Sequence, residues 1–382
     1  MPAGVTKLRI CRITKRAQPL VGGLEQHVHT LSEIQAGAGH QVTVFTLLGA
    51  SKAPDGSGYQ IRMLPGAWLA RMFPRELVIS ATTAITAFFS VIRAHRRQSF
   101  DVIHLHGDYF EAALGAVLGK LLGIPAVVTV HAGLNEGSLY QRVAGLAWRR
   151  VSQILVHAEE IKPELEALGV DPEHISFSHT AIWADRFDRP GEMTPAMSDT
   201  VTIASVGRLH PMKGYRYLVE AAALMPTDVP FRLIVVGDGP ERAELAALVE
   251  QTNSPIEFLG EISNADVPHL LWGADLYVQP SVSLPGQREA KPVAVQEAMA
   301  AGLPIVATPS GGIKDMVKDG VNGALVPERD PQALADALTK LMADPSARAR
   351  IRETNREQGR GYDWSHVARQ VEETYKKAGA TL

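Results

Sequence analysis

The chain has 382 residues, of which 46% are hydrophobic and 21% are charged, and its formal net charge is −3. A chain of this length exceeds the size at which a single hydrophobic core usually stops growing, so the sequence predicts two domains. The composition excludes a disordered protein, and the charge gives no general attraction to nucleic acid. The single cysteine, Cys11, lies in an apolar run and has no internal disulfide partner, which is typical of a reducing compartment.

Short apolar runs rich in β-branched residues alternate with longer helical patterns along the chain. This alternation predicts an α/β protein built on parallel sheets with crossover helices. In the first half the predicted strands are Leu8–Thr14, Gln41–Leu47, Asp101–His106, Ala126–His131 and Gln153–His157. In the second half they are Val201–Gly207, Arg232–Gly237, Ile256–Gly260, Leu276–Gln279 and Ile305–Thr308. The clearest predicted helices are Tyr215–Leu224, Glu241–Glu250, Pro331–Met342 and Trp364–Lys377.

The segment from Trp183 to Thr200 contains two prolines and a glycine and has little periodicity, which favours a linker. We therefore predict two Rossmann-like doubly wound domains, over residues 1–185 and 201–360, joined by a linker over 186–200. A C-terminal helix is expected within residues 361–382, with a return to the first domain as one option. In such sheets ligands bind beyond the carboxyl ends of the strands.

The longest uncharged segment, Leu77–Ile92, is shorter than the roughly 20 residues of a membrane-spanning helix and contains several serines and threonines. It predicts a buried or partly buried helix. The N-terminus lacks the apolar region of a signal peptide. We expect a cytoplasmic protein and leave open a peripheral contact with the inner face of the membrane.

Near this helix, aromatic and aliphatic residues alternate with arginines. Such a mixture suits an anionic membrane face or a lipid-diphosphate acceptor, and an ordinary surface loop and helix remain the alternative. The residues are Arg62, Trp68, Leu69, Arg71, Met72, Phe73, Arg75, Arg93, Arg96 and Arg97.

Three motifs follow predicted strands in the first half. The adjacent glycines Gly22 and Gly23 let the backbone approach a ligand closely. His104, His106 and Asp108 approximate a dinuclear-metal motif. Its last histidine is missing, so we expect no metal and assign His106 and Asp108 to the acceptor side. The next strand ends at His131, whose imidazole can hydrogen-bond a sugar hydroxyl or cap a loop.

In the second half, Arg208 and Lys213 flank a predicted strand-to-helix turn, where two cations and free backbone amides suit a diphosphate. Two solvated surface cations are the alternative. The following Gly237-Asp238-Gly239 begins like a dinucleotide motif, but Arg242 occupies the position of its third glycine. The motif is still compatible with a tight turn that lies against a nucleotide, but it does not predict hydride transfer.

The densest motif runs from Glu289 to Met299. Pro292 fits the first turn of a helix, which places Glu289 before the helix and Glu297 inside it. Carboxylates are suited to sugar hydroxyls, and the amides around Lys291 and Val293 are suited to phosphate oxygens. An ordinary exposed glutamate is the alternative for Glu297.

Together these motifs resemble the donor-binding domain of the retaining glycosyltransferases of GT-B fold in family 4. The resemblance covers about Val201 to Pro327. It rests on Val206-Gly207-Arg208-Leu209, Lys213-Gly214, Val236-Gly237-Asp238-Gly239-Pro240, Phe258-Leu259-Gly260, the spaced pair Glu289 and Glu297, and Gly320-Val321-Asn322-Gly323. Ala290 and Lys291 depart from the glycine and apolar residue common after the first glutamate, so they bear on sugar choice.

By this resemblance, Arg208 and Lys213 hold the donor diphosphate, Glu297 the ribose and Glu289 the transferred sugar. The donor site also includes Gly22, Gly23, Gly237, Ala290, Lys291, Pro292 and Val293. His131 approaches the reacting sugar, which places it with Arg208, Lys213 and Glu289 as a catalytic candidate.

The resemblance thus implies a retaining hexosyltransferase that takes its sugar from a nucleotide-sugar, UDP- or GDP-linked, and we expect no cofactor or metal. The acceptor is a glycan, a lipid-linked glycan or a small molecule in cell-surface polysaccharide or glycoconjugate synthesis. Alternatives are a nucleotide-sugar 2-epimerase, a glycoside hydrolase using the two glutamates, and a nucleotide-sugar sensor without catalysis.

Overall fold

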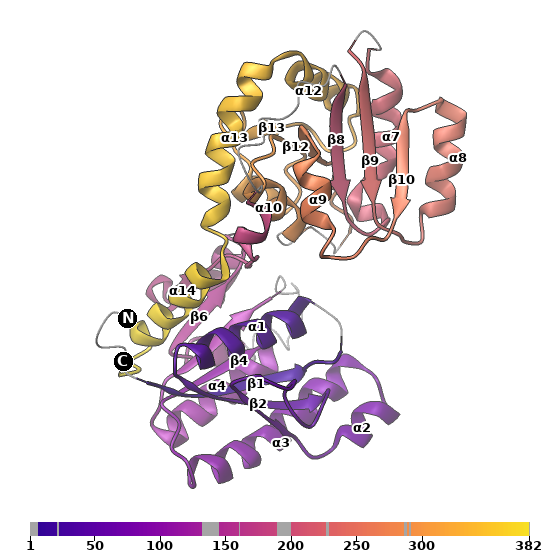
Figure 1. Ribbon diagram of the computed structural model, residues 1–382. Coiled ribbons are helices and arrows are strands. Elements are labelled where there is room, and N and C mark those ends of the chain that lie inside the picture. The colour runs from indigo at the N-terminus through magenta and orange to yellow at the C-terminus, as the bar shows by residue number, and fades with distance from the viewer. Residues whose placement is uncertain are drawn as a thin grey trace. The chain divides into compact units, whose positions relative to one another are not determined.

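The computed structural model describes residues 7–20, 23–131, 145–159, 161–188, 200–226, 229–285, 289 and 292–381. The chain forms two compact units, Met1–His179 with Trp364–Leu382, and Thr180–Asp363. Each unit contains a parallel β-sheet with helices on both faces (Figure 1), which confirms the predicted fold class. The exact domain boundaries remain a prediction, because most of the predicted linker lies outside the described residues.

The sheet of the first unit has the order β3-β2-β1-β4-β5-β6-β7, and its described neighbours pair in parallel. Its strand order reverses direction between β1 and β4, where a ligand is expected at the carboxyl ends. The strands are β1 Arg9–Arg16, β2 Gln41–Leu48, β3 Gln60–Met63, β4 Val102–His106, β5 Ala126–Val130, β6 Gln153–Val156 and β7 Ile175–Phe177.

Two helix layers cover this sheet. One contains α1 and the C-terminal helix α14, which pack against each other and against β2 and β6 respectively, and the other contains α3 and α4. Cys11 is buried in the core between the sheet and the second layer. The helices are α1 Gly23–Gly37, α2 Ala67–Met72, α3 Glu76–His95, α4 Tyr109–Leu122, α6 Ile161–Ala167 and α14 Trp364–Lys377.

The sheet of the second unit has the order β10-β9-β8-β11-β12-β13, with the reversal between β8 and β11. One core lies under α7, α8 and α12, and a second lies under α9, α10 and α11. The strands are β8 Val201–Val206, β9 Phe231–Val236, β10 Ile256–Gly260, β11 Leu276–Gln279, β12 Ile305–Ala307 and β13 Gly323–Leu325. The helices are α7 Tyr215–Leu224, α8 Arg242–Thr252, α9 Val267–Trp272, α10 Val293–Ala300, α11 Ile313–Met316, α12 Pro331–Ala343 and α13 Pro345–Arg360.

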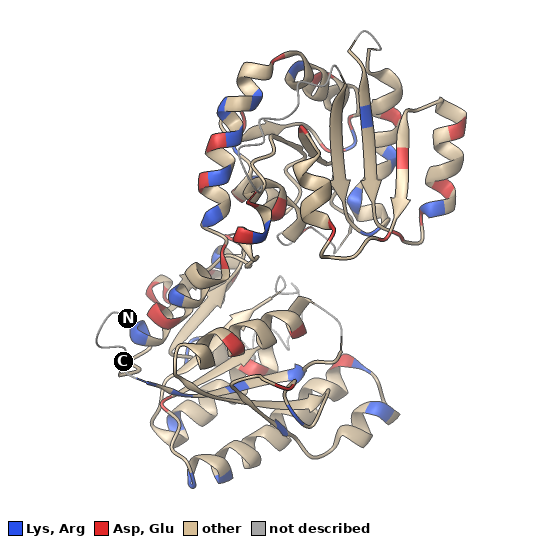
Figure 2. Ribbon diagram, in the orientation of Figure 1, with Lys and Arg blue, Asp and Glu red and all other residues tan. Residues whose placement is uncertain are grey.

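Helix α3 contains the long uncharged segment of the sequence. It is long and apolar enough to cross a membrane when judged by length and composition alone. One side of it, including Ile79, Ala87 and Val91, is buried in the core of the first unit. Figure 2 shows that most of its ribbon carries no charge. The prediction of a partly buried helix is thus confirmed.

Candidate active site

The turn after β8 borders a pocket of about 510 Å³ in the second unit. The pocket is lined by Arg208, Gly237, Asp238, Gly239 and Glu261, which follow β8, β9 and β10. These strands are neighbours and parallel, so their carboxyl ends meet at one edge of the sheet, beside the point where the strand order reverses. The sequence-predicted Arg208 and Gly237 are therefore brought together at the expected place.

The two predicted phosphate-binding cations have different environments. Arg208 is exposed and forms no ion pair within the part of the chain that the structure describes. Lys213 ends a short 3-10 helix, Pro211–Lys213, and its ammonium group forms an ion pair with the buried carboxylate of Glu289. The Arg208 guanidinium is thus open to solvent at the pocket, whereas the Lys213 ammonium compensates a buried carboxylate.

Glu289 is held in place by its backbone as well as by Lys213. Its side chain is buried, and its carbonyl oxygen accepts a hydrogen bond of 3.1 Å from the Gly312 amide. Ala290 and Lys291 lie outside the described residues, so their roles in the predicted site are not addressed by the structure. Glu289 and Lys213 form one charge-compensated pair, which the sequence treated as two separate ligand-binding groups.

Helix α10 begins at Val293, with Pro292 as the residue preceding its first turn. The Val295 amide donates to the Pro292 carbonyl oxygen, and the amides of the first turn are the natural anion donors of a helix start. Glu297 lies one turn further along, and burial raises the pKa of its carboxyl to about 7. It is not the fully exposed glutamate that the alternative interpretation assumed.

Gly237 is required by the geometry of this pocket. Its φ is +135°, and a Cβ there would overlap the carbonyl oxygen of Gly207. We expect Gly237→Ala to lower the free energy of unfolding of the second unit by about 3 kcal/mol and to weaken nucleotide binding. Gly260→Ala is the matched control, because φ is +74° there but a Cβ would meet nothing within 4 Å. The control is expected to cost about 1 kcal/mol in a urea titration, and equal losses in the two variants would contradict the steric argument.

In the first unit, five histidines lie near the ends of β4, β5 and β6. They are His27, His104, His106, His131 and His157. The Nδ1 of His106 and the Nε2 of His131 are 3.0 Å apart, and the rings of His27 and His157 both lie beside that of His131. Burial, and to a smaller degree the neighbouring His157, hold the pKa of His131 well below its usual value. Because the charged form is disfavoured, the imidazole of His131 is neutral at pH 7.

His104, from the motif that only approximates a dinuclear-metal site, makes hydrogen bonds within the first unit. His104 lies 2.7 Å from both the Tyr375 hydroxyl at Nδ1 and the Thr129 hydroxyl at Nε2, so it offers no ring nitrogen to a metal. Nitrogens of His27, His131 and His157 lie within 4.8 Å of one another, and this trio can hold a metal ion. This trio was not predicted from the sequence. The feature that could have revealed it is that His157, like His131, ends a predicted strand.

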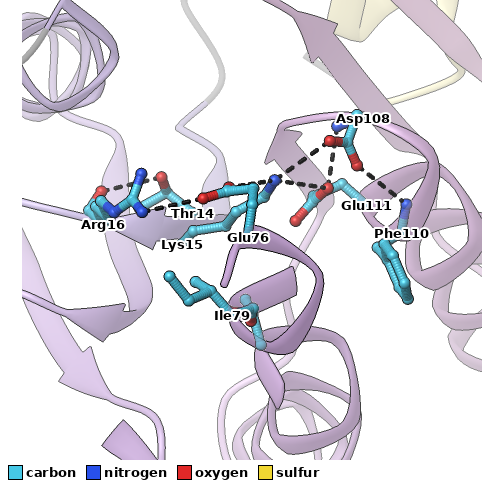
Figure 3. A network of polar contacts seen from close by, with 9 residues as sticks. Thr14, Lys15, Arg16, Glu76, Ile79, Asp108, Phe110 and Glu111 are labelled. Atoms are coloured by element: carbon cyan, nitrogen blue, oxygen red, sulfur yellow. Dashed lines mark hydrogen bonds and ion pairs between the residues drawn. The ribbon is translucent and has the colours of Figure 1, made fainter. Parts of the chain in front are cut away.

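Asp108 lies at the carboxyl end of β4 in a network of charges (Figure 3). Its carboxylate caps α4, and Glu111 accepts a hydrogen bond of 3.0 Å from the Asp108 amide. Lys15, at the end of β1, lies 3.3 Å from Asp108 and 3.1 Å from Glu76 at the start of α3. Burial raises the pKa of Glu111 to about 7, against the opposing effect of Lys15. The network joins β1, α3 and α4 at the carboxyl edge of the neighbouring strands β1 and β4, where the strand order reverses.

The glycine-rich loop is described only in part. Gly22 lies outside the described residues, and Gly23 is the first residue of α1. A Cβ at Gly23 would meet nothing within 4 Å, so the described residues impose no steric requirement for glycine at this position.

The chain matches two family models that together span most of its length. Residues 194–358 match Glycosyl transferases group 1, and residues 21–186 match Glycosyltransferase Family 4. A phosphatidyl-myo-inositol mannosyltransferase of Mycobacterium leprae is 29% identical over 97% of this chain and 96% of its own. A putative colanic acid biosynthesis glycosyltransferase, WcaL of Salmonella typhimurium, is 37% identical over 73% of this chain and 71% of its own.

The fold is similar to that of solved glycosyltransferases. The crystal structure of Anabaena HepE in complex with UDP aligns with a TM-score of 0.73 at 20% identity, covering 97% of this chain and 100% of that one. At this identity the similarity establishes the fold alone, and the sequence relatives establish the family. The chain therefore belongs to the group 1 glycosyltransferases of family 4 and is a GT-B enzyme that transfers a sugar from a nucleotide-sugar donor.

Proposed function

We propose that this enzyme transfers a hexose from UDP- or GDP-sugar to a glycan or lipid-linked acceptor, with retention of anomeric configuration. The product would belong to cell-surface polysaccharide or glycoconjugate synthesis, as the names of the mannosyltransferase and colanic acid relatives suggest for those proteins. The observation that carries the proposal is the pocket beside Arg208, where a guanidinium without an ion pair among the described residues meets the turns after three parallel strands.

On the donor side, the diphosphate would lie against Arg208 and the start of α10, with Lys213 nearby. Glu297 would accept hydrogen bonds from ribose hydroxyls, and Glu289, Ala290 and Lys291 would contact the transferred sugar. The Lys213–Glu289 ion pair supports this assignment, because it fixes a buried carboxylate beside a predicted phosphate-binding cation. A carboxylate is a strong acceptor for hydrogen bonds from sugar hydroxyls.

The chemical step would be a same-face substitution at the anomeric carbon. The bond from that carbon to the donor phosphate oxygen breaks, and the bond to the acceptor oxygen forms on the same face. The acceptor proton passes to a phosphate oxygen of the departing nucleoside diphosphate. Arg208 and the amides of α10 stabilise the charge that develops on the leaving group, so these groups would serve in place of a metal.

On the acceptor side, neutral His131 would donate or accept a hydrogen bond at a sugar hydroxyl, with His106 fixing its ring. Asp108, at the end of β4, would face the acceptor. We further propose that the protein is cytoplasmic and works at the inner face of the membrane, where lipid-linked acceptors are found.

A screen of donors tests this function. We expect UDP or GDP and one of their sugars to raise the melting temperature by several degrees, and ADP- and CMP-sugars to have no comparable effect. With the selected donor, nucleotide release should require an acceptor and yield a product with the donor's anomeric configuration, as read by NMR. Release of free nucleotide without an acceptor, or an inverted product, would contradict the proposal.

A further inference from the structure

Three histidines of the first unit, His27, His131 and His157, form a compact triangle. Their ring centroids are 5.1 Å, 5.1 Å and 5.3 Å apart, and one nitrogen of each ring lies within 4.8 Å of the other two. For three atoms so spaced, some point lies within about 2.8 Å of all of them, whereas a bond from Zn²⁺ to imidazole is about 2.0–2.1 Å long. Shifts of less than about 1 Å would therefore bring the three nitrogens to bonding distance of one ion.

Regular secondary structure positions each of these rings. His131 comes directly after β5 and His157 directly after β6, and the last residues of these strands, Val130 and Val156, are paired in the sheet. His27 is a buried residue of α1, which packs on the same sheet. The trio is thus fixed by two neighbouring strand ends and a helix, which hold ligands more precisely than a loop does.

The hydrogen bonds around the trio suit metal ligation. The Nδ1 of His157 donates to the Ser178 carbonyl oxygen at 3.0 Å, so the lone pair of the neutral ring is on Nε2. A backbone carbonyl is a common partner for the second nitrogen of a metal-ligating histidine. The Nε2 of His27 is buried and has no hydrogen-bond partner among the residues that the structure describes. Buried polar atoms are nearly always satisfied, and a bound ion would satisfy this one.

The third member of the trio has access to solvent. His131 is partly exposed, whereas His27 and His157 are buried. The Nε2 of His131 lies 3.0 Å from the Nδ1 of His106, a contact that orients the ring as a second partner orients a metal ligand. With tetrahedral coordination, an ion at the trio would have three protein nitrogens and one position for water or another outside ligand.

The donor set selects the kind of ion. Three neutral imidazoles suit Zn²⁺ and similar first-row ions, whereas Mg²⁺ and Ca²⁺ prefer oxygen ligands. The site is also distinct from the motif of His104, His106 and Asp108. Both ring nitrogens of His104 are engaged by hydroxyl groups, whereas the trio takes its nitrogens from two other strand ends and from α1.

We propose that His27, His131 and His157 form a Zn²⁺-binding site and that the bound ion inhibits sugar transfer. A neutral imidazole has a single nitrogen lone pair, and coordination to a metal uses it. His131 would then be unable to accept a hydrogen bond from a sugar hydroxyl, and the ion with its outside ligand would stand in the way of that hydroxyl. The inhibition rests on the proposed function, in which His131 contacts a sugar, whereas the binding of the ion does not.

Titration of the metal-free full chain with Co²⁺ tests the binding. Co²⁺ replaces Zn²⁺ in tetrahedral sites and absorbs visible light strongly there. We expect one Co²⁺ per chain with a tetrahedral spectrum, and we expect Zn²⁺ to displace it. Zn²⁺ should also raise the melting temperature by several degrees, because it binds the folded chain, and Mg²⁺ should have neither effect.

Two variants and a control locate the ion. His157→Asn keeps a donor for the Ser178 carbonyl oxygen but lacks Nε2, and His27→Phe keeps an aromatic ring beside Trp364, whose ring lies 5.2 Å from that of His27. Each should weaken Co²⁺ binding by about 100-fold or more, and two variants allow for the failure of one to fold. The matched control, His174→Asn, changes an exposed histidine of the same unit and should bind Co²⁺ as wild type does. The site is overturned if wild type gives no tetrahedral spectrum, or if the folded variants bind Co²⁺ as tightly as wild type.

The inhibition is measured in the transfer assay with the selected donor and acceptor. Zn²⁺ at a concentration that displaces Co²⁺ should abolish wild-type turnover, and a chelator should restore it. His157→Asn should keep its own metal-free turnover at the same Zn²⁺ concentration. Unchanged wild-type turnover would overturn the inhibition. If no donor is turned over, the proposed function fails and the inhibitory role falls with it, while the Co²⁺ spectrum still decides whether the metal site exists.

Discussion

Arg208→Ala should lower kcat by about 10²–10³-fold while leaving the protein folded. The guanidinium is proposed to stabilise the charge on the departing diphosphate, and loss of one such donor costs about 3–4 kcal/mol of transition-state stabilisation. The side chain is exposed and forms no ion pair among the described residues, so its removal should change the free energy of unfolding by less than about 0.5 kcal/mol. Steady-state kinetics and urea unfolding measure the two effects.

Arg232→Ala is the matched control for this prediction. Arg232 lies near the amino end of β9, away from the pocket edge, and pairs with Glu257 at 2.9 Å in an exposed position. It should retain wild-type turnover. Arg208→Lys should recover part of the activity, since it restores the charge but not the planar fork. Unchanged turnover in Arg208→Ala would contradict the proposal that Arg208 contacts the donor diphosphate.

Lys213→Ala is expected to behave differently from Arg208→Ala, and the contrast tests the site geometry. Lys213 compensates the buried carboxylate of Glu289, so its removal leaves that charge without its ion pair. Loss of one partner of a buried pair typically costs about 3–5 kcal/mol. Activity and stability should therefore fall together in this variant, and a fully stable Lys213→Ala protein would contradict the pairing.

Glu297→Gln should stabilise the unliganded protein and weaken donor binding. The carboxyl pKa is raised to about 7 by burial, above the value of about 4.5 in the unfolded chain. Between these values the folded state keeps a proton that the unfolded state has lost, so stability falls as pH rises from 4.5 to 7. A glutamine does not ionise, so the variant does not lose stability in this pH range. Its free energy of unfolding at pH 8 should therefore exceed that of wild type by up to roughly 3 kcal/mol.

Donor binding should change in the opposite direction. The ionised carboxylate is the form proposed to accept the ribose hydroxyls, so wild-type affinity should increase as pH rises through about 7. Loss of charge-assisted hydrogen bonds worth about 1.5–3 kcal/mol should weaken donor binding by roughly 10–150-fold in Glu297→Gln and remove the pH dependence. Calorimetric titration at pH 6 and pH 8 measures both.

Glu244→Gln, at a side chain 70% exposed on α8, is the matched control and should alter neither quantity. A Glu297→Gln protein that is less stable than wild type at pH 8 would mean that burial does not penalise this charge. Unchanged donor affinity would mean that Glu297 does not contact the nucleotide.

The ten strands predicted from the sequence are all present, with ends that differ by at most two residues. Most of those strands are buried runs of branched apolar residues, and this local pattern is strong; β10 is the exception, since none of its residues is fully buried. The edge strands β3, β7 and β13 were missed because they are three or four residues long and partly exposed. Helix α13 was missed because it buries only Ala347, Ile351, Asn355 and Gly359, which leaves no apolar stripe to detect.

Helix α3 shows a different limit of prediction from the sequence. Its sequence is apolar on both sides, so the pattern could not say which side faces the core. Packing against the sheet selects Ile79, Ala87 and Val91 for burial and leaves Ile85 and Phe89 in solvent. The apolar composition of this helix was visible in the sequence, and the choice of the side that faces solvent was not.

The candidate site also combines features that the sequence determined with features that only the tertiary structure decided. The sequence by itself determined the α/β class, the strand ends and the motifs that carry Arg208, Gly237 and Glu297, because residue type and spacing are local properties. Only the tertiary structure decided that Lys213 is paired with Glu289, that His131 is neutral among other histidines, and that Glu297 titrates near pH 7. Ion pairing and desolvation depend on which distant segments are brought together and on how much water they exclude, and neither is encoded in the spacing of neighbouring residues.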